Sequence, residues 1–456
     1  PDKTTALCGT SYLAFFYFKE DIMDFITSDI KKLYGKYLIA SLASAVVMSI
    51  YSFVDSIAVG QSVGPIGAAS MAVITPLYGV LIFLAILCGV GGSVLYGNAR
   101  GEGNAEKANA LFTAATVLMI GLILFAWVVF ALFHEPIFTF FGADAELMPT
   151  VMEYARWLIW FLPAFILPTF ISSFIRNDGA PNLAMTAVIV GGGVNIFCDW
   201  FFCFPLDMGM TGAALATVLG TCIQVVIMCS HFFTKKCTLR FVKPNHVKPA
   251  ISQTLSIGFG ASALDLGTVI LAIIMNNQIM RYGDTTALAV YGVVATITSL
   301  FQALYCGVGQ AIQPIVSANC GAMQTKRIKQ TWKMSLTTVM VMGCLFTVIG
   351  ELFPEQIVKL FIDATPQVIE AAPSIIRPFF LLFLFLGITV LATYHLQSIM
   401  HGTMSMVIAV LRSVVISGLL LFALPFFLDI TGVWIAMPIS EFIVAVVALL
   451  YIYKRT

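Results

Sequence analysis

Long apolar runs separated by short polar segments make up almost the whole chain. Residues 110–133, for example, contain no charged side chain. A helix needs about 20 predominantly apolar residues to cross the hydrocarbon core of a bilayer, so each such run predicts a membrane-spanning helix. We therefore expect an all-α polytopic membrane protein. Its twelve transmembrane helices are predicted near residues 34–58, 66–97, 105–133, 147–174, 182–204, 210–233, 251–280, 286–312, 330–350, 372–400, 404–427 and 431–453.

The composition agrees with this pattern. Hydrophobic residues make up 59% of the chain and charged residues 10%, whereas a soluble domain carries about 25% charged residues. The ten cysteines form no CxxC pair, so neither a disulfide framework nor a metal site is expected from them. Residues 1–30 lack a basic start and a small-residue cleavage site, so we expect an N-terminal cytoplasmic or interfacial segment there, not a cleaved signal.

Lysine and arginine are distributed unevenly between the two predicted sides of the membrane. If the N-terminus is cytoplasmic, the loops on the opposite side hold little more than Arg281 and Lys359. The cytoplasmic side then holds Lys31, Lys32, Lys36, Arg100, Lys107, Arg176, Lys235, Lys236, Arg240, Lys243, Lys248, Lys326, Arg327, Lys329, Lys333, Lys454 and Arg455. Basic residues concentrate on the cytoplasmic side of membrane proteins. The asymmetry predicts a multi-pass protein of the cell inner membrane with both termini in the cytoplasm.

The two halves of the chain resemble each other at an offset of 220 residues. Leu132-Phe-His-Glu-Pro-Ile137 matches Leu352-Phe-Pro-Glu-Gln-Ile357, and Met210-Thr-Gly212 matches Ile430-Thr-Gly432. Each repeat holds six spans, an even number, so both halves enter the membrane with the same orientation. Parallel repeats of this kind are typical of transporters that bind substrate between the halves, although channels and membrane enzymes also contain two-fold repeats.

This repeat predicts two parallel six-helix lobes around a central cavity. The N-lobe is expected at residues 31–233 and the C-lobe at residues 251–456. Residues 234–250 would form the cytoplasmic linker between them.

Three polar residues interrupt the apolar runs of the first half: Asp55, Asn195 and Asp199. A charge at the bilayer centre costs about 2.5–3.5 kcal/mol on insertion scales, so such residues usually face a cavity, a partner or an ion. Asn195 and Asp199 are four residues apart and share one helix face. Asp55 must meet them from the first helix if its charge is to be compensated. Two neighbouring carboxylates titrate as a unit and can hold H⁺ or Na⁺; the alternative is a purely structural hydrogen bond from Asp199.

Five motifs of the chain form a recognisable set. They are Val54-Asp55-Ser-Ile-Ala-Val-Gly60, Gly97-Asn-Ala-Arg-Gly101-Glu-Gly103, Ile175-Arg-Asn-Asp-Gly179, Asn195-Ile-Phe-Cys-Asp199 and Gly209-Met-Thr-Gly-Ala-Ala-Leu-Ala-Thr217. This set resembles the multidrug and toxic compound extrusion (MATE) family of secondary transporters. The resemblance covers residues 31–453, and within the family the chain looks most similar to the bacterial DinF-like and MepA-like branch.

The resemblance implies a site for a coupling cation, H⁺ or Na⁺, in the N-lobe. Matched motif to motif, that site consists of Asp55, Asn195, Asp199 and Thr217, with Tyr154 contributing to the same polar cluster. The chain departs from the family at Tyr37-Leu-Ile-Ala40, where many members carry a proline early in the first span. A proline-dependent bending of that helix is therefore not expected.

Other polar residues within the spans are candidates for a substrate cavity: Asp265, Asn276, Gln302 and His395, together with Tyr154. Each also has a structural interpretation. Asp265 would then be paired, the amides would join helices, and His395 would be a packed helix histidine. Arg412 and Glu441 are opposite charges at membrane depth, and we expect them to pair with each other.

These observations together favour a secondary active efflux antiporter. It would export amphipathic, cationic small organic molecules in exchange for H⁺ or Na⁺, as a monomer in the lipid bilayer, without a cofactor and without nucleic acid. Alternatives are a dedicated exporter of one natural product or pathway intermediate and a lipid-linked flippase of the same superfamily. A membrane enzyme is disfavoured because the sequence has no HExxH motif, nucleophile elbow or phosphate loop.

Overall fold

The computed structural model describes residues 25–243, 247–361 and 365–455, which are helical almost throughout and contain no strand. The first half consists of α1 (Ile30–Ser62), α2 (Pro65–Gly101), α3 (Ala105–Phe140), α4 (Met148–Trp160), α5 (Leu162–Asn177), α6 (Pro181–Cys203), α7 (Gly209–Cys229) and the 3₁₀ turn η2 (Ser230–Phe233). The second half consists of α8 (Val247–Tyr282), α9 (Thr285–Gly321), α10 (Thr325–Leu352), α11 (Pro354–Phe361), α12 (Pro366–Phe380), α13 (Phe383–Ser398), α14 (Gly402–Val410), the π-helical turn η3 (Leu411–Val415) and α15 (Ile416–Arg455).

The helices make the twelve expected passes, although two of the passes are broken. Eight helices are long and apolar enough to cross a membrane, and the bent pairs α4–α5 (53°) and α12–α13 (40°) bring the number to ten. The 36-residue helix α8 makes the eleventh pass. α15 makes two passes, because the chain reverses direction at Asp429. The reversal is evident from Ser417 and Ser440, which lie on either side of Asp429 and whose hydroxyl oxygens are hydrogen-bonded at 2.7 Å.

The break between α4 and α5 was not expected from the sequence, which predicts a single span over residues 147–174. Pro163 lies in the first turn of α5. Proline has no backbone N–H and cannot continue the hydrogen-bond ladder of the preceding helix. Phe161 accordingly leaves the helical conformation, with φ −104° and ψ 22°.

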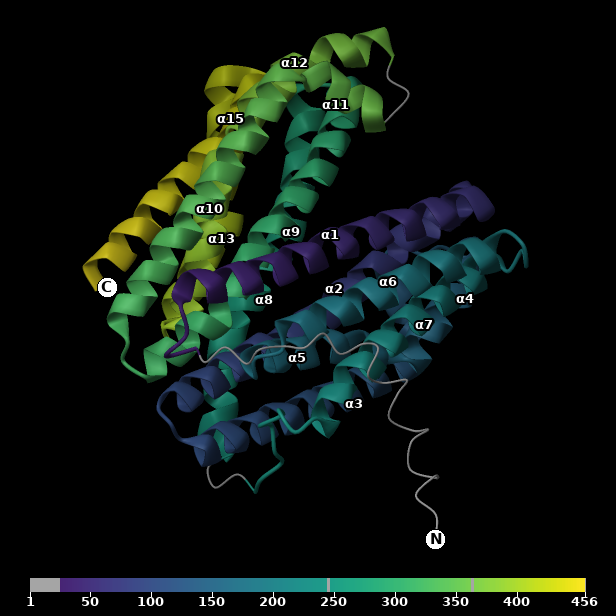
Figure 1. Cartoon of the computed structure of the whole chain (residues 1–456). Helices are drawn as coiled ribbons and strands as arrows, with labels where there is room; N and C mark the ends of the chain where they lie inside the picture. Colours follow the sequence, from purple (N-terminus) through teal and green to yellow (C-terminus); the bar gives the residue numbers. More distant parts are fainter. Residues whose placement is uncertain (1–24, 244–246, 362–364, 456) are drawn as a thin grey trace.

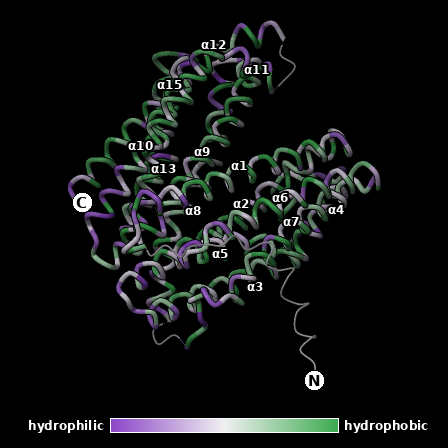
Figure 2. The backbone as a smooth tube through the Cα atoms, in the orientation of Figure 1, coloured by the Kyte–Doolittle hydropathy of each residue, from purple (hydrophilic) through white to green (hydrophobic). Residues whose placement is uncertain are grey.

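The passes form two bundles that lie together at one end and separate toward the other (Figure 1). We call the first end the linker end, because it carries residues 234–243 and the starts of α1, α3, α6, α8 and α10. The other, here the open end, carries α11, the start of α12 and the end of α1. Hydrophobic residues cover most of the length of the bundles, and hydrophilic residues gather at the helix ends (Figure 2). This distribution fits bundles surrounded by lipid.

The first helix of each lobe starts against the core of the other lobe. Leu33 and Tyr37 of α1 are buried in the core formed by the second half of the chain. Ile257 and Ala261 of α8 are buried in the core formed by the first half. Tyr37 and Ile257 are 220 residues apart, so the crossing follows the repeat. The predicted lobe limits, 31–233 and 251–456, stay a prediction, since the helices that would open the two lobes are shared between them.

The backbones of α2 and α9 touch at the linker end through a pair of glycines. A Cβ atom on Gly101 would overlap the carbonyl oxygen of Ala318, and a Cβ atom on Gly321 would overlap that of Asn98. Both pairs of residues, 101 with 321 and 98 with 318, are separated by 220 positions. The contact is therefore the same surface used twice around a pseudo-two-fold axis, as in a symmetric dimer.

Polar contacts beside this crossing join the lobes further. Arg176, which is buried, donates to Gln310 Oε1 of α9 at 2.7 Å and to Ser41 Oγ of α1 at 3.1 Å. The next residue, Asn177, accepts a hydrogen bond from Ser317 Oγ at 3.2 Å. The end of α5 is thereby fixed to both α1 and α9.

The segment after α7 docks on the turn between α5 and α6. Asp178 of that turn accepts hydrogen bonds from Thr238 N at 2.9 Å, from His231 Nε2 at 2.7 Å and from Tyr96 OH at 3.0 Å. Burial raises the pKa of the Asp178 carboxyl, but the bonds from His231 and Thr238 outweigh this effect and hold the pKa below its usual range. Asp178 is therefore a carboxylate that fixes the start of the linker to the N-lobe.

The glycine contact gives a first prediction. Gly101→Ala and Gly321→Ala should each separate the two lobes at the linker end. In either variant, the added methyl group would overlap a backbone carbonyl oxygen of the facing helix, α9 or α2. Spin labels on Glu106 and Lys326, two exposed positions 220 residues apart at the starts of α3 and α10, would report the separation. Pulsed electron–electron double resonance should give longer distances between the two labels in both variants.

Gly121→Ala in α3 is the matched control. A Cβ atom there meets no heavy atom within 4 Å, and alanine favours a helix interior over glycine by about 0.5–1 kcal/mol. This variant should keep the distance distribution of the unsubstituted chain. If the two variants at the crossing behave like the control, the glycine contact does not hold the linker end closed.

Candidate functional site

A buried polar cluster lies in the half of the N-lobe nearer the open end, with Thr217 of α7 at its centre. Thr217 Oγ1 donates to Asp55 Oδ1 of α1 at 3.4 Å and accepts from Asn195 Nδ2 of α6 at 3.5 Å. The hydroxyl of Tyr154 of α4 lies 3.4 Å from the same oxygen. Tyr78 of α2 extends this row of hydrogen bonds, because its hydroxyl oxygen lies 2.9 Å from that of Tyr154. Five helices thus contribute to one polar cluster inside an apolar bundle.

Glycines allow the helices that carry this cluster to approach closely. A Cβ atom on Gly191 of α6 would lie 2.6 Å from the carbonyl oxygen of Gly220 of α7. One on Gly220 would lie 2.9 Å from Asn195 Cβ. Gly192 faces α1, where a Cβ atom would lie 3.2 Å from Tyr51 Cδ1. Small residues at such crossings are typical of membrane bundles. Here they bring the polar side chains of α1, α6 and α7 within reach of one another.

Asp199 is the most unusual member of the cluster. Its exposed fraction is 0%, and neither of its carboxylate oxygens has a hydrogen-bond partner among the described residues. The Oδ1 atom of Asn195, one turn earlier on α6 and also buried, lacks a partner as well. Asp199 and Asp55 are close enough to interact electrostatically. Leaving a carboxylate buried without a partner is very unfavourable, so such groups normally bind a cation or a proton.

The arrangement suits a small cation chemically. The oxygens without a partner, together with Asp55 and the Thr217 hydroxyl, are hard ligands of the type preferred by H⁺ and by hard metal cations. Asp55 is partly exposed whereas Asp199 is not. The sequence analysis predicts that Asp55, Asn195, Asp199, Thr217 and Tyr154 form one polar cluster. The structure brings these five residues together.

The remaining candidates lie elsewhere. Asn276 is exposed on α8, and Gln302 of α9 accepts a hydrogen bond from Arg412 Nη2 at 3.3 Å. His395 of α13 is fully buried, with its ring centroid 4.6 Å from that of Trp332. The structure does not place these three in the N-lobe cluster. The side chain of Asp265, in α8, lies outside the described residues.

The sequence did not single out Tyr78. No spacing or motif distinguishes this tyrosine from the other aromatic residues of the apolar runs. Its position two residues after Pro76, inside α2, is the only local signal. Its hydrogen bond to Tyr154 depends on the packing of α2 against α4, which is a tertiary contact.

The C-lobe contains a buried ion pair, whereas the N-lobe contains an acidic cluster. Arg412 Nε donates to Glu441 Oε1, which confirms the expected pairing, and both residues are buried. Thr389 Oγ1 donates to the other carboxylate oxygen at 2.5 Å. Arg412 belongs to the π-helical turn η3, and π-turns inside α-helices are frequent at functional positions. The charges of this cluster compensate each other without an added ion.

This ion pair gives a second prediction. Arg412→Met should lower the free energy of unfolding by about 3–5 kcal/mol, because it leaves Glu441 buried without its partner. The double variant Arg412→Met/Glu441→Leu should recover most of the loss. Thermal unfolding of the purified protein in detergent, followed by tryptophan fluorescence, measures both effects.

Lys359→Met provides the control, since the Lys359–Glu355 pair is exposed and its N–O distance is 3.9 Å. Exposed pairs contribute about 0–1 kcal/mol. An Arg412→Met variant as stable as Lys359→Met would contradict the assigned role of the ion pair.

The comparisons with known proteins agree with this architecture. The MatE family model matches residues 40–201 and 265–422. The chain is 24% identical over 444 residues to the multidrug export protein MepA of Staphylococcus haemolyticus (strain JCSC1435), covering 96% of this chain and 95% of that protein. It is 26% identical over 338 residues to the probable multidrug resistance protein YoeA of Bacillus subtilis (strain 168), covering 72% of both.

The fold is also shared with a solved structure, an outward-facing conformation of a multidrug resistance MATE family transporter of the MOP superfamily. The TM-score is 0.88 at 22% identity, covering 96% of this chain and 98% of that one. The resemblance expected from the motifs is confirmed, because the matched segments span well over half of the chain and both lobes. The chain therefore belongs to the MatE family, the multidrug and toxic compound extrusion transporters.

Proposed function

We propose that the protein is a secondary active antiporter that exports amphipathic, cationic small organic molecules in exchange for H⁺ or Na⁺. The coupling cation would bind at Asp55, Asn195, Asp199 and Thr217. The observation that carries this proposal is the buried Asp199 carboxylate, which has no hydrogen-bond partner among the described residues and lies near a second carboxylate. The names of the relatives, a multidrug export protein and a probable multidrug resistance protein, support the choice of substrate class.

Helix α1 provides the physical link between the ion site and the lobe contact. Near the open end it carries Asp55, which is hydrogen-bonded to α7. At the linker end it carries Tyr37, which is buried in the core of the C-lobe. α1 contains no proline and runs as one helix from Ile30 to Ser62. We infer that a change of charge at Asp55 and Asp199 moves α1 as a rod and thereby shifts the packing of the two lobes.

Antiport requires that the cation and the substrate prefer different conformations. A bound H⁺ or Na⁺ removes the repulsion between Asp55 and Asp199, whereas the empty site leaves two carboxylates in a low-dielectric environment. A cationic substrate near the partly exposed Asp55 would relieve the same repulsion, so that cation and substrate compete. This competition couples entry of the ion to release of the substrate.

The distribution of basic residues between the two ends of the bundles supports one orientation of the protein in the membrane. The linker end carries Arg100, Lys107, Lys235, Lys326 and Arg327, whereas few basic residues lie at the open end. The positive-inside rule places the linker end in the cytoplasm. The lobes would then be closed toward the cytoplasm and separated toward the outside. We propose that the protein works in this orientation as a monomer in the inner membrane.

A third prediction tests the ion site. Asp55→Asn and Asp199→Asn should abolish dye efflux driven by an ion gradient, because an amide at either position removes a negative charge on which cation binding depends. Accumulation of a cationic fluorescent dye in everted vesicles, first under a pH gradient and then under a Na⁺ gradient, measures the effect and identifies the ion. Membrane insertion should be unchanged.

Asp144→Asn is the matched control for these substitutions. Asp144 is exposed and accepts hydrogen bonds from the backbone N–H groups of Glu146 and Leu147, which asparagine can also accept. Dye transport by this variant should equal that of the unsubstituted chain. Full transport by both Asp55→Asn and Asp199→Asn would exclude the proposed ion site. An unsubstituted chain that responds to neither gradient would exclude polyspecific cation antiport.

A fourth prediction tests the orientation. A cysteine at Leu206, which is half exposed in the turn between α6 and α7 at the open end, should react with a membrane-impermeant maleimide on intact cells. A cysteine at the exposed Lys235 of the linker should react only after the cells are permeabilised. The labelling of the unsubstituted chain is the background for both. The reverse pattern would place the linker end outside.

A further inference from the structure

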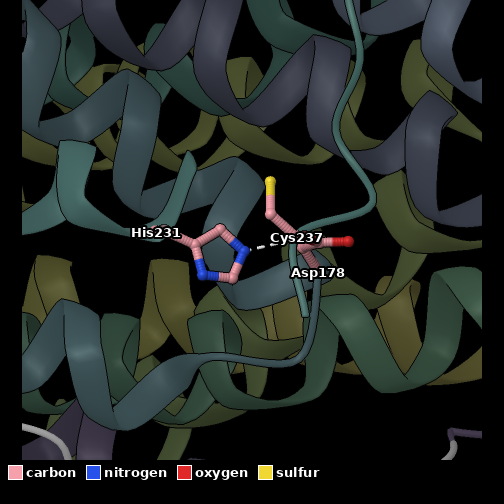
Figure 3. A group of neighbouring side chains, drawn as sticks. All are labelled: Asp178, His231 and Cys237. Carbon is pink, nitrogen blue, oxygen red and sulfur yellow. Dashed lines mark hydrogen bonds and ion pairs between the residues drawn. The ribbon is translucent and has the colours of Figure 1, made fainter. Parts of the chain in front are cut away.

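Asp178, His231 and Cys237 form a compact cluster of side chains (Figure 3). The cluster belongs to the α5–α6 turn and the segment after α7, and it shares no residue with the proposed ion site. One possible ligand atom of each residue lies within 4.8 Å of those of the other two. The side chains of His231 and Asp178 are 4% and 1% exposed, and Cys237 is buried. The proposed transport mechanism uses none of the three.

The local fold presents these side chains to one another. α5 ends at Asn177, and Gly179 adopts a positive φ of +91°, which turns the chain into α6. The Asp178 side chain of this turn points toward the linker, where it accepts a hydrogen bond from Thr238 N. On the other side, Thr234 N donates to His231 O at 3.0 Å and Cys237 N donates to Thr234 O at 3.3 Å. These two turns bring Cys237 back beside His231. The pattern His-x₅-Cys contains no CxxC element, so no metal site is predicted here from the sequence.

The donor set matches a thiophilic divalent cation. Imidazole nitrogen, thiolate sulfur and carboxylate oxygen are the three ligand types of zinc sites in proteins. A thiolate among them excludes Na⁺, Mg²⁺ and Ca²⁺ as preferred occupants. Tetrahedral Zn²⁺, with bonds of about 2.0–2.3 Å, separates neighbouring ligand atoms by about 3.3–3.7 Å. The His231 Nε2–Asp178 Oδ2 distance of 2.7 Å would have to lengthen by less than an ångström.

A second set of hydrogen bonds already orients the ligands. Tyr96 OH donates to Asp178 Oδ1 at 3.0 Å, and the backbone N–H of Thr238 donates to Asp178 Oδ2 at 2.9 Å. Partners of this kind fix metal ligands in proteins, and their loss typically weakens metal binding about 10–100-fold. The cluster is thus supported in the manner of a metal site. Three protein ligands leave a fourth coordination position for water.

We propose that Asp178, His231 and Cys237 bind a thiophilic divalent cation such as Zn²⁺, which clasps the linker to the N-lobe. Binding releases the thiol proton of Cys237 and the proton between His231 and Asp178 to solvent, and no redox change occurs. The clasp lies directly after Arg176 and Asn177, the two residues of α5 that bind α9 across the lobe contact. The cation therefore stabilises the α5–α6 turn in the position that keeps the linker end closed.

Cobalt is the probe that tests this proposal, because Co²⁺ bound to a thiolate gives a charge-transfer absorption that Co²⁺ bound to oxygen or nitrogen alone does not. The purified full-length protein, stripped with a chelator, should show this absorption with one equivalent of Co²⁺ and lose it when Zn²⁺ is added. Cys237→Ser should abolish the band. Tyr96→Phe should keep it but weaken Co²⁺ binding about 10–100-fold.

Cys344→Ser is the matched control, because Cys344 is an exposed, free cysteine of α10; this variant should keep the band. As a second readout, Zn²⁺ should raise the thermal midpoint of the unsubstituted chain and not that of Cys237→Ser. Absence of the band in the unsubstituted chain, or an equal band in Cys237→Ser, would overturn the proposal. In that case the three residues form a hydrogen-bonded clasp without a metal. Neither outcome depends on the transport proposal.

Discussion

The backbone crossing of α2 and α9 at the linker end is the contact on which the rest of the architecture depends. Gly101 and Gly321 leave no space for a side chain between the two helices, so in this structure the lobes meet backbone to backbone around the pseudo-two-fold axis. The starts of α1 and α8, each buried in the core of the opposite lobe, extend the same contact. With the linker ends held together, the lobes separate toward the other end (Figure 1), where the polar cluster of the N-lobe lies.

The two repeats share a fold but differ in how their buried charges are compensated. In the C-lobe, Arg412 and Glu441 neutralise each other, and Thr389 satisfies the second carboxylate oxygen. In the N-lobe, neither Asp55 nor Asp199 belongs to any of the ion pairs formed by the described residues. A closed ion pair stabilises its lobe without external ligands, whereas an acidic pair requires a cation. We therefore propose that ion coupling belongs to the N-lobe and that the C-lobe pair has a structural role.

Much of the fold could be predicted from the sequence, because membrane helices satisfy their backbone hydrogen bonds internally and are visible in the sequence as long apolar runs. The twelve passes, the 220-residue repeat and the residues of the N-lobe cluster followed from apolar runs, spacing and motifs. The break at Phe161, the role of Tyr78 and the clasp of Asp178 with His231 and Cys237 did not. Each of these depends on which helices or turns touch, and neither sequence spacing nor composition encodes that contact directly.

We propose that the charge at Asp199 sets the packing of the lobes at the linker end. The most direct test is the label-to-label distance between Glu106 and Lys326, measured in lipid nanodiscs as the pH is lowered and, separately, as Na⁺ is added. The unsubstituted chain should change its distance distribution with one of the two cations, and Asp199→Asn should keep one distribution under all conditions. An Asp199→Asn variant that responds like the unsubstituted chain would show that the charge at Asp199 does not control the packing of the lobes.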